Sequence, residues 1–183
     1  MLRRSLLTSA IAASLLTTFS LPAFATQVYE TDLVIIGGGL SGLAAAQSAV
    51  DQGAKPIVLE KEAALGGGGN FPEGSLGVGT RYQKEHNINT TVDQVLTAAL
   101  QYHHYRADPH VLRVLIEESG KTIDWVMDKG AQMRGIRTMY PKDESLMTWH
   151  LFKGGAAGII QRFAKEVRAK GGTILTETPA KKL

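Results

Sequence analysis

The chain has 183 residues, of which 44% are hydrophobic and 20% charged, and this composition predicts a globular domain with its own core. The formal net charge is only +3, and no basic stripe points to a nucleic-acid partner. Cysteine is absent, which excludes disulfides, cysteine-ligated iron–sulfur clusters, thiol-linked flavin and covalent c-type haem within this sequence.

Residues 1–25 have the pattern of a signal peptide. They combine a positive start at Arg3 and Arg4, an uncharged apolar stretch over 6–21 and a small-x-small cleavage pattern at 23–25. A transmembrane anchor is the alternative, but the apolar stretch is short for one. The paired arginines are compatible with either the Sec or the twin-arginine export route. We therefore expect cleavage after residue 25, a location in the bacterial periplasm, and no membrane anchor.

A strand, a helix and a second strand are expected within residues 32–60. The run 32–36 is apolar after its first residue, as in a strand that is buried on both faces. An Ala-rich helix over 40–52 and a second apolar strand over 56–59 follow it. Such a βαβ unit is parallel. The sequence thus predicts an α/β fold with a Rossmann-like, doubly wound parallel sheet that is incomplete at the C-terminus.

The turn between the first strand and the helix carries a dinucleotide-binding motif. Gly37, Gly39 and Gly42 form G-x-G-x-x-G at the place where the motif requires it. Gly39 lets a pyrophosphate approach the backbone, and the helix N-terminus offers free N–H groups to the phosphates. Glu60, which ends the second strand, can accept hydrogen bonds from ribose hydroxyls and would repel a 2′-phosphate. The pattern argues against NADP and leaves both NAD and FAD open.

Helices are expected through the middle of the chain. Residues 63–79 form a long glycine-rich loop, a length that is usually functional when it lies inside a compact domain. Two helices follow, one with a capping box at Thr91 and one that begins at Asp108 and Pro109. The expected buried residues are Val92, Val95, Leu96, Ala99 and Leu100 in the first helix and Val111, Leu112, Leu115 and Ile116 in the second.

The C-terminal part contains one clear helix and one strand. Residues 134–153 give no clear assignment. Residues 156–170 form an amphipathic helix, and 173–176 begin a third strand. The buried side of that helix is expected to consist of Ile159, Ile160, Phe163, Ala164 and Val167.

A resemblance to a known family rests on these motifs together. The run 32–46, the Val-Leu-Glu-Lys at 58–61 and the glycines at 66–69 are similar to the fumarate reductase/succinate dehydrogenase flavoprotein family of FAD-dependent oxidoreductases, in its soluble flavocytochrome c-like branch. The resemblance covers nearly all of 32–183. It favours FAD over NAD because of the glycine cluster after Glu60. An NAD-dependent Rossmann enzyme stays as an alternative, which retention of NAD without flavin absorbance would support.

The resemblance implies roles for particular residues. In the family, the second glycine cluster and the polar residue after it follow the pyrophosphate and ribityl chain, and the next glycine-rich stretch, which begins here at Gly74, passes the flavin ring. The candidate cofactor-binding residues are Gly37, Gly39, Leu40, Ser41, Gly42, Glu60, Lys61, Gly68, Gly69, Asn70, Gly74 and Ala180.

The family also implies an activity and partners. These are hydride transfer between FAD and an activated carbon–carbon bond of a small substrate, such as an unsaturated carboxylic acid, with a cytochrome or quinol system as the external electron carrier. No histidine occurs between Gly66 and Lys84, where membrane-bound members attach FAD, so we expect non-covalent FAD.

We expect 26–183 to be the N-terminal part of an FAD-binding domain, with a helical insertion over about 80–170. In the family the capping domain and its catalytic residues come later, so no catalytic residue is assigned here. The alternative is a truncated, catalytically silent chain that only binds nucleotide. A downstream reading frame that encodes a capping domain would distinguish the two.

Five histidines raise the question of a metal site. His103 and His104 would point about 100° apart on a helix. His110 lies beyond a helix break, and no H-E-x-x-H pattern is present. We therefore expect no metal. His150 aligns with a family position near a glycine-rich helix start, where packing or flavin contact is favoured over a role as a neutral hydrogen-bond donor beside the flavin.

Overall fold

A computed structural model describes residues 27–139 and 145–182. The chain divides into a short unit, Met1–Glu30, and a larger unit, Thr31–Leu183, and only the larger one is considered below. The expected signal peptide lies outside the described residues. In chain order, the elements are β1 (Leu33–Ile36), α1 (Leu40–Asp51), β2 (Pro56–Leu59), the 3-10 turn η1 (Gly67–Asn70), β3 (Gly74–Leu76), α2 (Arg81–Glu85), α3 (Val92–Tyr102), α4 (Pro109–Asp128), β4 (Met133–Thr138), β5 (Met147–Phe152), α5 (Gly155–Ala169) and β6 (Thr173–Leu175).

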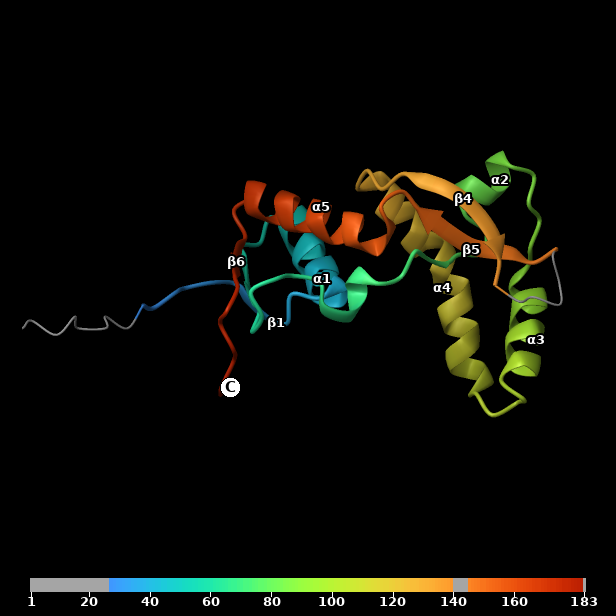
Figure 1. Ribbon diagram of the computed structural model, residues 1–183, viewed down its shortest axis with the longest axis horizontal. Coiled ribbons are helices and arrows are strands. Elements are labelled where there is room, and N and C mark those ends of the chain that lie inside the picture. Colours follow the sequence, from blue (N-terminus) through green and yellow to red (C-terminus); the bar gives the residue numbers. More distant parts are fainter. Residues whose placement is uncertain (1–26, 140–144, 183) are drawn as a thin grey trace, which may run out of the picture. The chain divides into compact units, whose positions relative to one another are not determined.

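The three expected strands form a parallel sheet in the order β1-β2-β6, which confirms the α/β class. Ile35, Val58 and Ile174 lie side by side across it in register. They pack against Val50 of α1 and Val167 of α5. Both helices lie over this one face of the sheet (Figure 1). The five inward residues expected for α5 are all buried.

The opposite face of β1 is not covered by any helix that the structure describes. Val34 is 52% exposed and Ile36 is 55% exposed. The expectation that this strand is buried on both faces was therefore wrong for the described part of the chain. The reason is that α1, which follows β1, and α5, which precedes β6, pack on the same side of the sheet.

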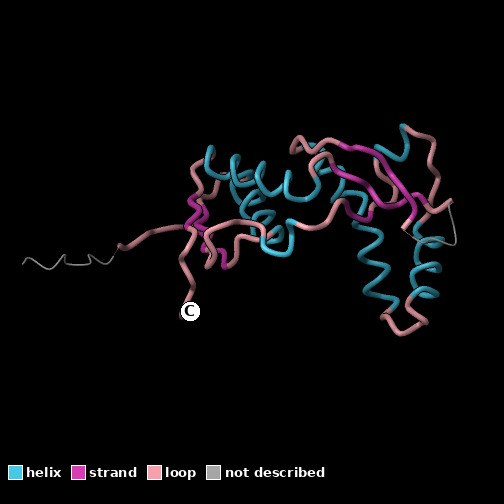
Figure 2. The backbone as a smooth tube through the Cα atoms, in the orientation of Figure 1, coloured by secondary structure: helices cyan, strands magenta, loops and turns pink. Residues whose placement is uncertain are grey.

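A second, antiparallel sheet has the order β3-β5-β4 (Figure 2). It lies within the segments expected to be a loop and a helical insertion, so the insertion over about 80–170 is not purely helical. Along β5 the buried side chains alternate as Thr148, His150 and Phe152. Two of these three are polar, and the alternation therefore does not appear as a hydrophobic pattern in the sequence.

The helical hairpin of α3 and α4 begins as expected. Thr91 forms a complete capping box with Gln94, and the Asp108 side chain accepts from the N–H groups of two residues in the first turn of α4. The buried face expected for α4 is wrong at Val111 and Leu115, which are 67% and 58% exposed.

A close approach of the backbone of α4 to the segment before α2 explains this difference. A Cβ added at Gly120 would lie 2.1 Å from the carbonyl oxygen of Val78, so this part of α4 touches the Val78 backbone. The contact face therefore runs through Ile116, Ser119, Gly120 and Ile123, which are all buried. The small residues at 119 and 120 hid this face from a search for large apolar side chains.

Asp51, at the end of α1, connects three helices. Its carboxylate lies 2.5 Å from the Lys129 ammonium and 2.7 Å from that of Lys170. These two lysines follow α4 and α5 directly. Burial acts to raise the pKa of Asp51, but hydrogen bonds from Lys129, Lys170 and Gln47 lower this pKa to about 2. The group is therefore ionised throughout the physiological range and ties the C-terminal ends of the helices together.

Candidate dinucleotide-binding site

The turn between β1 and α1 requires glycine at two positions. Gly37 has φ +101°, a conformation that residues with a Cβ rarely adopt, and its N–H donates to the carbonyl of Leu59 at 2.8 Å. A Cβ at Gly42 would lie 1.9 Å from the carbonyl oxygen of Gly37. The first and third glycines of the motif thus allow the tight turn and the close packing of α1 against it.

The N-terminus of α1 is open toward an anion. Gly39 is the N-cap residue, no side chain caps the helix, and no acidic residue lies in the first turn. The first intrahelical bond runs from the N–H of Leu43 to the carbonyl of Gly39 at 2.9 Å. The N–H groups of Leu40, Ser41 and Gly42 therefore have no partner within the helix and carry the positive end of its dipole. This is the environment that phosphates prefer in proteins.

Glu60 joins the end of β2 to the glycine turn. It is 8% exposed, and its two carboxylate oxygens accept from the N–H of Gly38 at 2.7 Å and that of Glu62 at 2.9 Å. The hydrogen bonds from the N–H groups of Glu62 and Gly38 lower the pKa of Glu60, so the carboxylate stays charged. Each carboxylate oxygen can accept a second hydrogen bond. Glu60 therefore has the capacity to bind two hydroxyls while it holds the turn.

The second glycine cluster packs against the first. The N–H of Gly66 donates to the carbonyl of Gly38 at 2.8 Å, and Gly66 forms a parallel bridge with Gly39. A Cβ at Gly69 would lie 3.0 Å from the Cβ of Leu40, at the start of α1. Asn70 donates from Nδ2 to the carbonyl of residue 65 at 3.0 Å, which closes the 3-10 turn. The structure thus brings residues 66–70 against the N-terminus of α1.

Two residues of this arrangement were missed in the sequence. Gly38 is the middle of three glycines but stands at a variable position of the motif. A Cβ there would lie 2.6 Å from a methyl carbon of Leu65 and 3.1 Å from the Cβ of Glu60. Gly66 was noted only as part of a cluster. A glycine at position 38, where the motif allows any residue, was the signal that could have shown how closely these segments approach each other.

The remaining candidates lie at the margin or away from this arrangement. Ser41 is exposed, and Lys61 is exposed and pairs with Glu62 at 3.4 Å. Gly74 is buried in β3, where a Cβ would lie 2.0 Å from the carbonyl oxygen of His150, so strand packing already accounts for a glycine there. Ala180 is exposed beyond β6. Their contacts with a cofactor remain predictions.

A cleft of about 630 Å³ continues from the second glycine cluster along α5. Residues 63–65 and Asn70 line one side, and Lys165 and Arg168 of α5 are among the residues of the other. Glu60 also connects to the chain beyond β6, because its carbonyl accepts from the N–H of Thr178 at 2.8 Å. The segments around the carboxyl end of β2 therefore form one continuous surface.

Within 27–139 and 145–182, no group of three or more histidines and carboxylates could hold a metal ion. In the same ranges, no helix combines the length and the apolarity needed to cross a membrane.

His150, the one histidine that is fully buried, has both ring nitrogens within hydrogen-bond distance of Thr80 and Thr148. This geometry favours its packing role.

The geometry combines a parallel sheet, a glycine turn and an uncapped helix N-terminus, an arrangement typical of domains that bind dinucleotides. The sequence profile of the FAD binding domain family matches residues 32–183, and the chain belongs to this family. FAD is therefore the cofactor of this domain, which decides between the two dinucleotides that the glycine motif left open.

Several flavoenzymes and reductases are similar in sequence. The chain is 35% identical over 150 residues to the vinyl phenol reductase of Lactiplantibacillus plantarum. This alignment covers 81% of this chain and 30% of that protein. It is 31% identical to the NADH:fumarate oxidoreductase of Klebsiella pneumoniae, over 72% of this chain and 15% of that protein. It is also 31% identical to the fumarate reductase (cytochrome) of Shewanella frigidimarina, over 64% of this chain and 21% of that protein. The chain thus spans less than a third of the length of these relatives.

Solved structures share the fold. An open conformation of a flavocytochrome c3 fumarate reductase matches with a TM-score of 0.67 at 21% identity, over 80% of this chain and 26% of that chain. The 3-ketosteroid-delta4-(5alpha)-dehydrogenase of Rhodococcus jostii matches with the same score at 20% identity, over 84% and 39%. Because both sequence identities are below 25%, these matches show similarity of fold alone.

Proposed function

We propose that the whole protein is an exported FAD-dependent reductase of an activated carbon–carbon double bond, and that this chain supplies the part that holds FAD. The observation that carries the proposal is the meeting of three segments at the N-terminus of α1. These are the glycine turn, Glu60 and the second glycine cluster. Bound FAD supplies the hydride chemistry, which protein side chains do not provide on their own.

The residues of this chain would bind and orient the cofactor. The N–H groups in the first turn of α1 would neutralise the pyrophosphate, and the missing Cβ at Gly39 leaves space for it, since that atom would meet only the carbonyl oxygen of Gly66 at 3.7 Å. The charged carboxylate of Glu60 would accept from ribose hydroxyls.

Substrate and electron donor are proposed from the relatives. A vinyl phenol reductase, two fumarate reductases and an acrylate reductase flavoprotein subunit are among them. The substrates in these names have a double bond conjugated to a carboxylate or an aromatic ring. We therefore propose a small unsaturated acid as the substrate and a cytochrome or quinol system as the external electron carrier.

Flavin retention tests the FAD site. The purified chain, refolded with excess FAD and desalted, is expected to keep a flavin absorbance band. Glu60→Ala should lose this band, whereas Glu118→Ala, which removes an exposed carboxylate from α4, should keep it. Acid precipitation should release all of the flavin into the supernatant, because the cofactor is held non-covalently. A wild-type chain without bound flavin contradicts the FAD site, and flavin that stays with the precipitate contradicts non-covalent binding.

Export is proposed from the pattern of residues 1–25. A fusion of residues 1–30 to a reporter that is active only in the periplasm is expected to show activity. Replacement of Arg3 and Arg4 by lysines should abolish this activity if the twin-arginine route is used and preserve it if the Sec route is used. An inactive fusion with the unchanged leader contradicts export.

A further inference from the structure

We propose that a pocket between the first half of α5 and residues 131–132 binds a small organic carboxylate, at a site separate from the dinucleotide site. The pocket has a volume of about 230 Å³. It shares no residue with the glycine turn, Glu60 or the second glycine cluster. Its lining residues are Ala131, Gln132, Phe152, Lys153, Gly158, Ile159 and Arg162.

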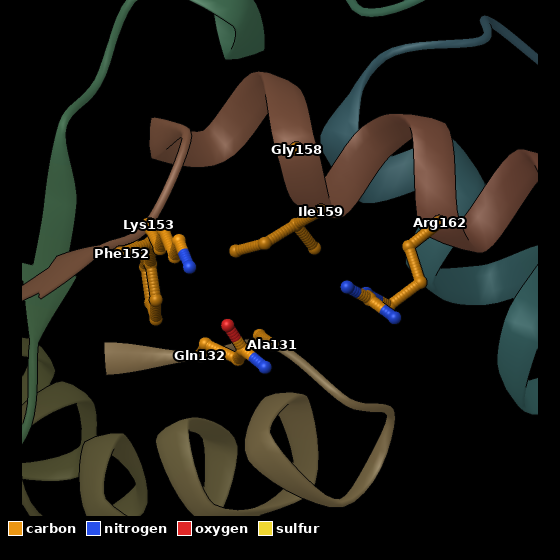
Figure 3. Close-up of a pocket in the computed structure, with 7 residues that line it drawn as sticks. All are labelled: Ala131, Gln132, Phe152, Lys153, Gly158, Ile159 and Arg162. Carbon is orange, nitrogen blue, oxygen red and sulfur yellow. The ribbon is translucent and has the colours of Figure 1, made fainter. Parts of the chain in front are cut away.

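The pocket has an apolar base and polar edges. Phe152 and Ile159 are each 4% exposed and belong to the hydrophobic core below it. Figure 3 shows the ends of Lys153, Gln132 and Arg162 directed toward the space between α5 and the segment that contains Gln132. Two cationic groups and one amide therefore approach the same small volume from different elements.

These two cations have no counter-ion among the described residues. Lys153 and Arg162 form no ion pair there, whereas Lys129 and Lys170 both bind Asp51. Arg81 likewise pairs with the Asp128 carboxylate at 2.6 Å. Two positive charges that face one cavity repel each other. An anion bound between them would attract both, so the net electrostatic interaction would become favourable.

Backbone contacts define the two sides of the pocket opening. The N–H of Lys153 donates to the carbonyl of Gln132 at 2.8 Å, which fixes the two sides of the opening relative to each other. The guanidinium of Arg162 lies against Gly130, where a Cβ would be 3.0 Å from its Nη1. Gly158, in the first turn of α5, leaves the wall free of a side chain, and the positive end of the helix dipole lies nearby.

The lining decides the class of ligand. An arginine and a lysine select an acid group, and an arginine binds a carboxylate well because its planar fork matches the two oxygens. The base formed by Phe152 and Ile159 favours an apolar body, which inorganic phosphate lacks. The volume lies below the range of about 300–1,000 Å³ that is typical of sites for drug-sized ligands. A carboxylate with a short carbon chain fits the two cations, the apolar base and the small volume.

Butyrate, its neutral amide and inorganic phosphate are suitable probes for the purified chain without FAD. Ligand-observed NMR titration is expected to show saturable binding of butyrate and none of butyramide. Lys153→Met and Arg162→Met should each weaken butyrate binding at least about tenfold, because each removes one charge-assisted hydrogen bond. Lys84→Met and Arg106→Met remove exposed cations that do not line the pocket, and should leave the affinity unchanged.

Several outcomes would overturn the proposal. These are no saturable binding of butyrate, equal loss of affinity in the two pairs of variants, or binding of phosphate as tight as that of butyrate. Circular dichroism of each variant shows whether it is folded, and Lys153 and Arg162 are both exposed, so their replacement should not disturb the core. Because FAD is absent from the titration, the result does not depend on the FAD site.

Discussion

Replacement of Gly42 by alanine is expected to abolish FAD retention and to lower the free energy of unfolding by about 3 kcal/mol. The added Cβ would lie 1.9 Å from the carbonyl oxygen of Gly37 and 3.1 Å from its carbonyl carbon. These are backbone atoms and no flexible side chain can give way, so the turn and the start of α1 must separate. Urea unfolding of the purified chain measures the stability, and flavin absorbance after desalting measures the retention.

Gly39→Ala is the matched variant for this experiment. A Cβ at Gly39 would have only one neighbour, the carbonyl oxygen of Gly66 at 3.7 Å, which is an ordinary contact. The free energy of unfolding should therefore stay within about 0.5 kcal/mol of the original. FAD affinity should nevertheless fall, because the Cβ occupies the space in which a pyrophosphate approaches the backbone. A Gly42→Ala chain with an unchanged urea midpoint would contradict the packing argument.

The parts of the fold that the sequence predicts well are those in which cause and effect are local. The apolar runs at 32–36 and 56–59 and the Ala-rich helix between them determine a βαβ unit from neighbouring residues. The capping box at Thr91 and the Asp108–Pro109 pair likewise act within one helical turn. No distant contact was needed to place these elements.

The second sheet and the contact face of α4 depend on distant contacts. β5 pairs with β3, which is more than 70 residues earlier, and its buried residues include Thr148 and His150, of which His150 lies within hydrogen-bond distance of the Thr80 hydroxyl. In α4, Gly120 packs directly on the backbone at Val78, and the larger Val111 and Leu115 remain exposed. Hydrophobic periodicity cannot reveal a buried face that is made of small or polar residues.

The candidate site likewise combines features that depend on local sequence with features that depend on distant contacts. The glycine turn and Glu60 belong to one sequence motif, and the structure joins them through the hydrogen bond from the N–H of Gly38 to the Glu60 carboxylate. The contact of Gly38 with Leu65 and the bridge from Gly39 to Gly66 join loops that are separated by a helix and a strand. Such a contact becomes visible only when both loops are placed at the same edge of the sheet.

His150→Ala is the second substitution for which we expect a large effect. His150 is fully buried, and a Cβ at Gly77 would lie 2.8 Å from its ring. Its Nδ1 lies 3.0 Å from the carbonyl of Thr148, and its Nε2 lies 2.9 Å from the hydroxyl of Thr80. A carbonyl can only accept, so Nδ1 carries the proton and Nε2 accepts from Thr80. Thr80 in turn caps α2, where its hydroxyl accepts from the N–H of Gln83 at 3.0 Å.

The alanine variant should lower the free energy of unfolding by about 3 kcal/mol, because it leaves a cavity and removes the nearest acceptor for the proton of the Thr80 hydroxyl. His110→Ala, which removes an exposed imidazole, should change it by less than about 0.5 kcal/mol. Urea denaturation at pH 7.5 measures both. Similar midpoints for the two variants would show that the buried network contributes little to stability.

The dependence of stability on pH gives an independent test of the neutral imidazole. Burial lowers the pKa of His150 below its ordinary value of 6.5, and the hydrogen bond to the Thr148 carbonyl and the charge of Asp124 oppose this only in part. Below about pH 6.5 the unfolded chain therefore binds a proton that the folded chain resists. The contribution of His150 to stability is complete above pH 6.5 and decreases as the pH falls toward the lower pKa of the folded state. A His150→Gln variant cannot titrate, so the loss of stability between pH 7.5 and pH 5.5 should be smaller in this variant than in the original chain. An equal loss in both would mean that the pKa of His150 is not lowered in the folded chain, which would contradict a buried imidazole that resists protonation.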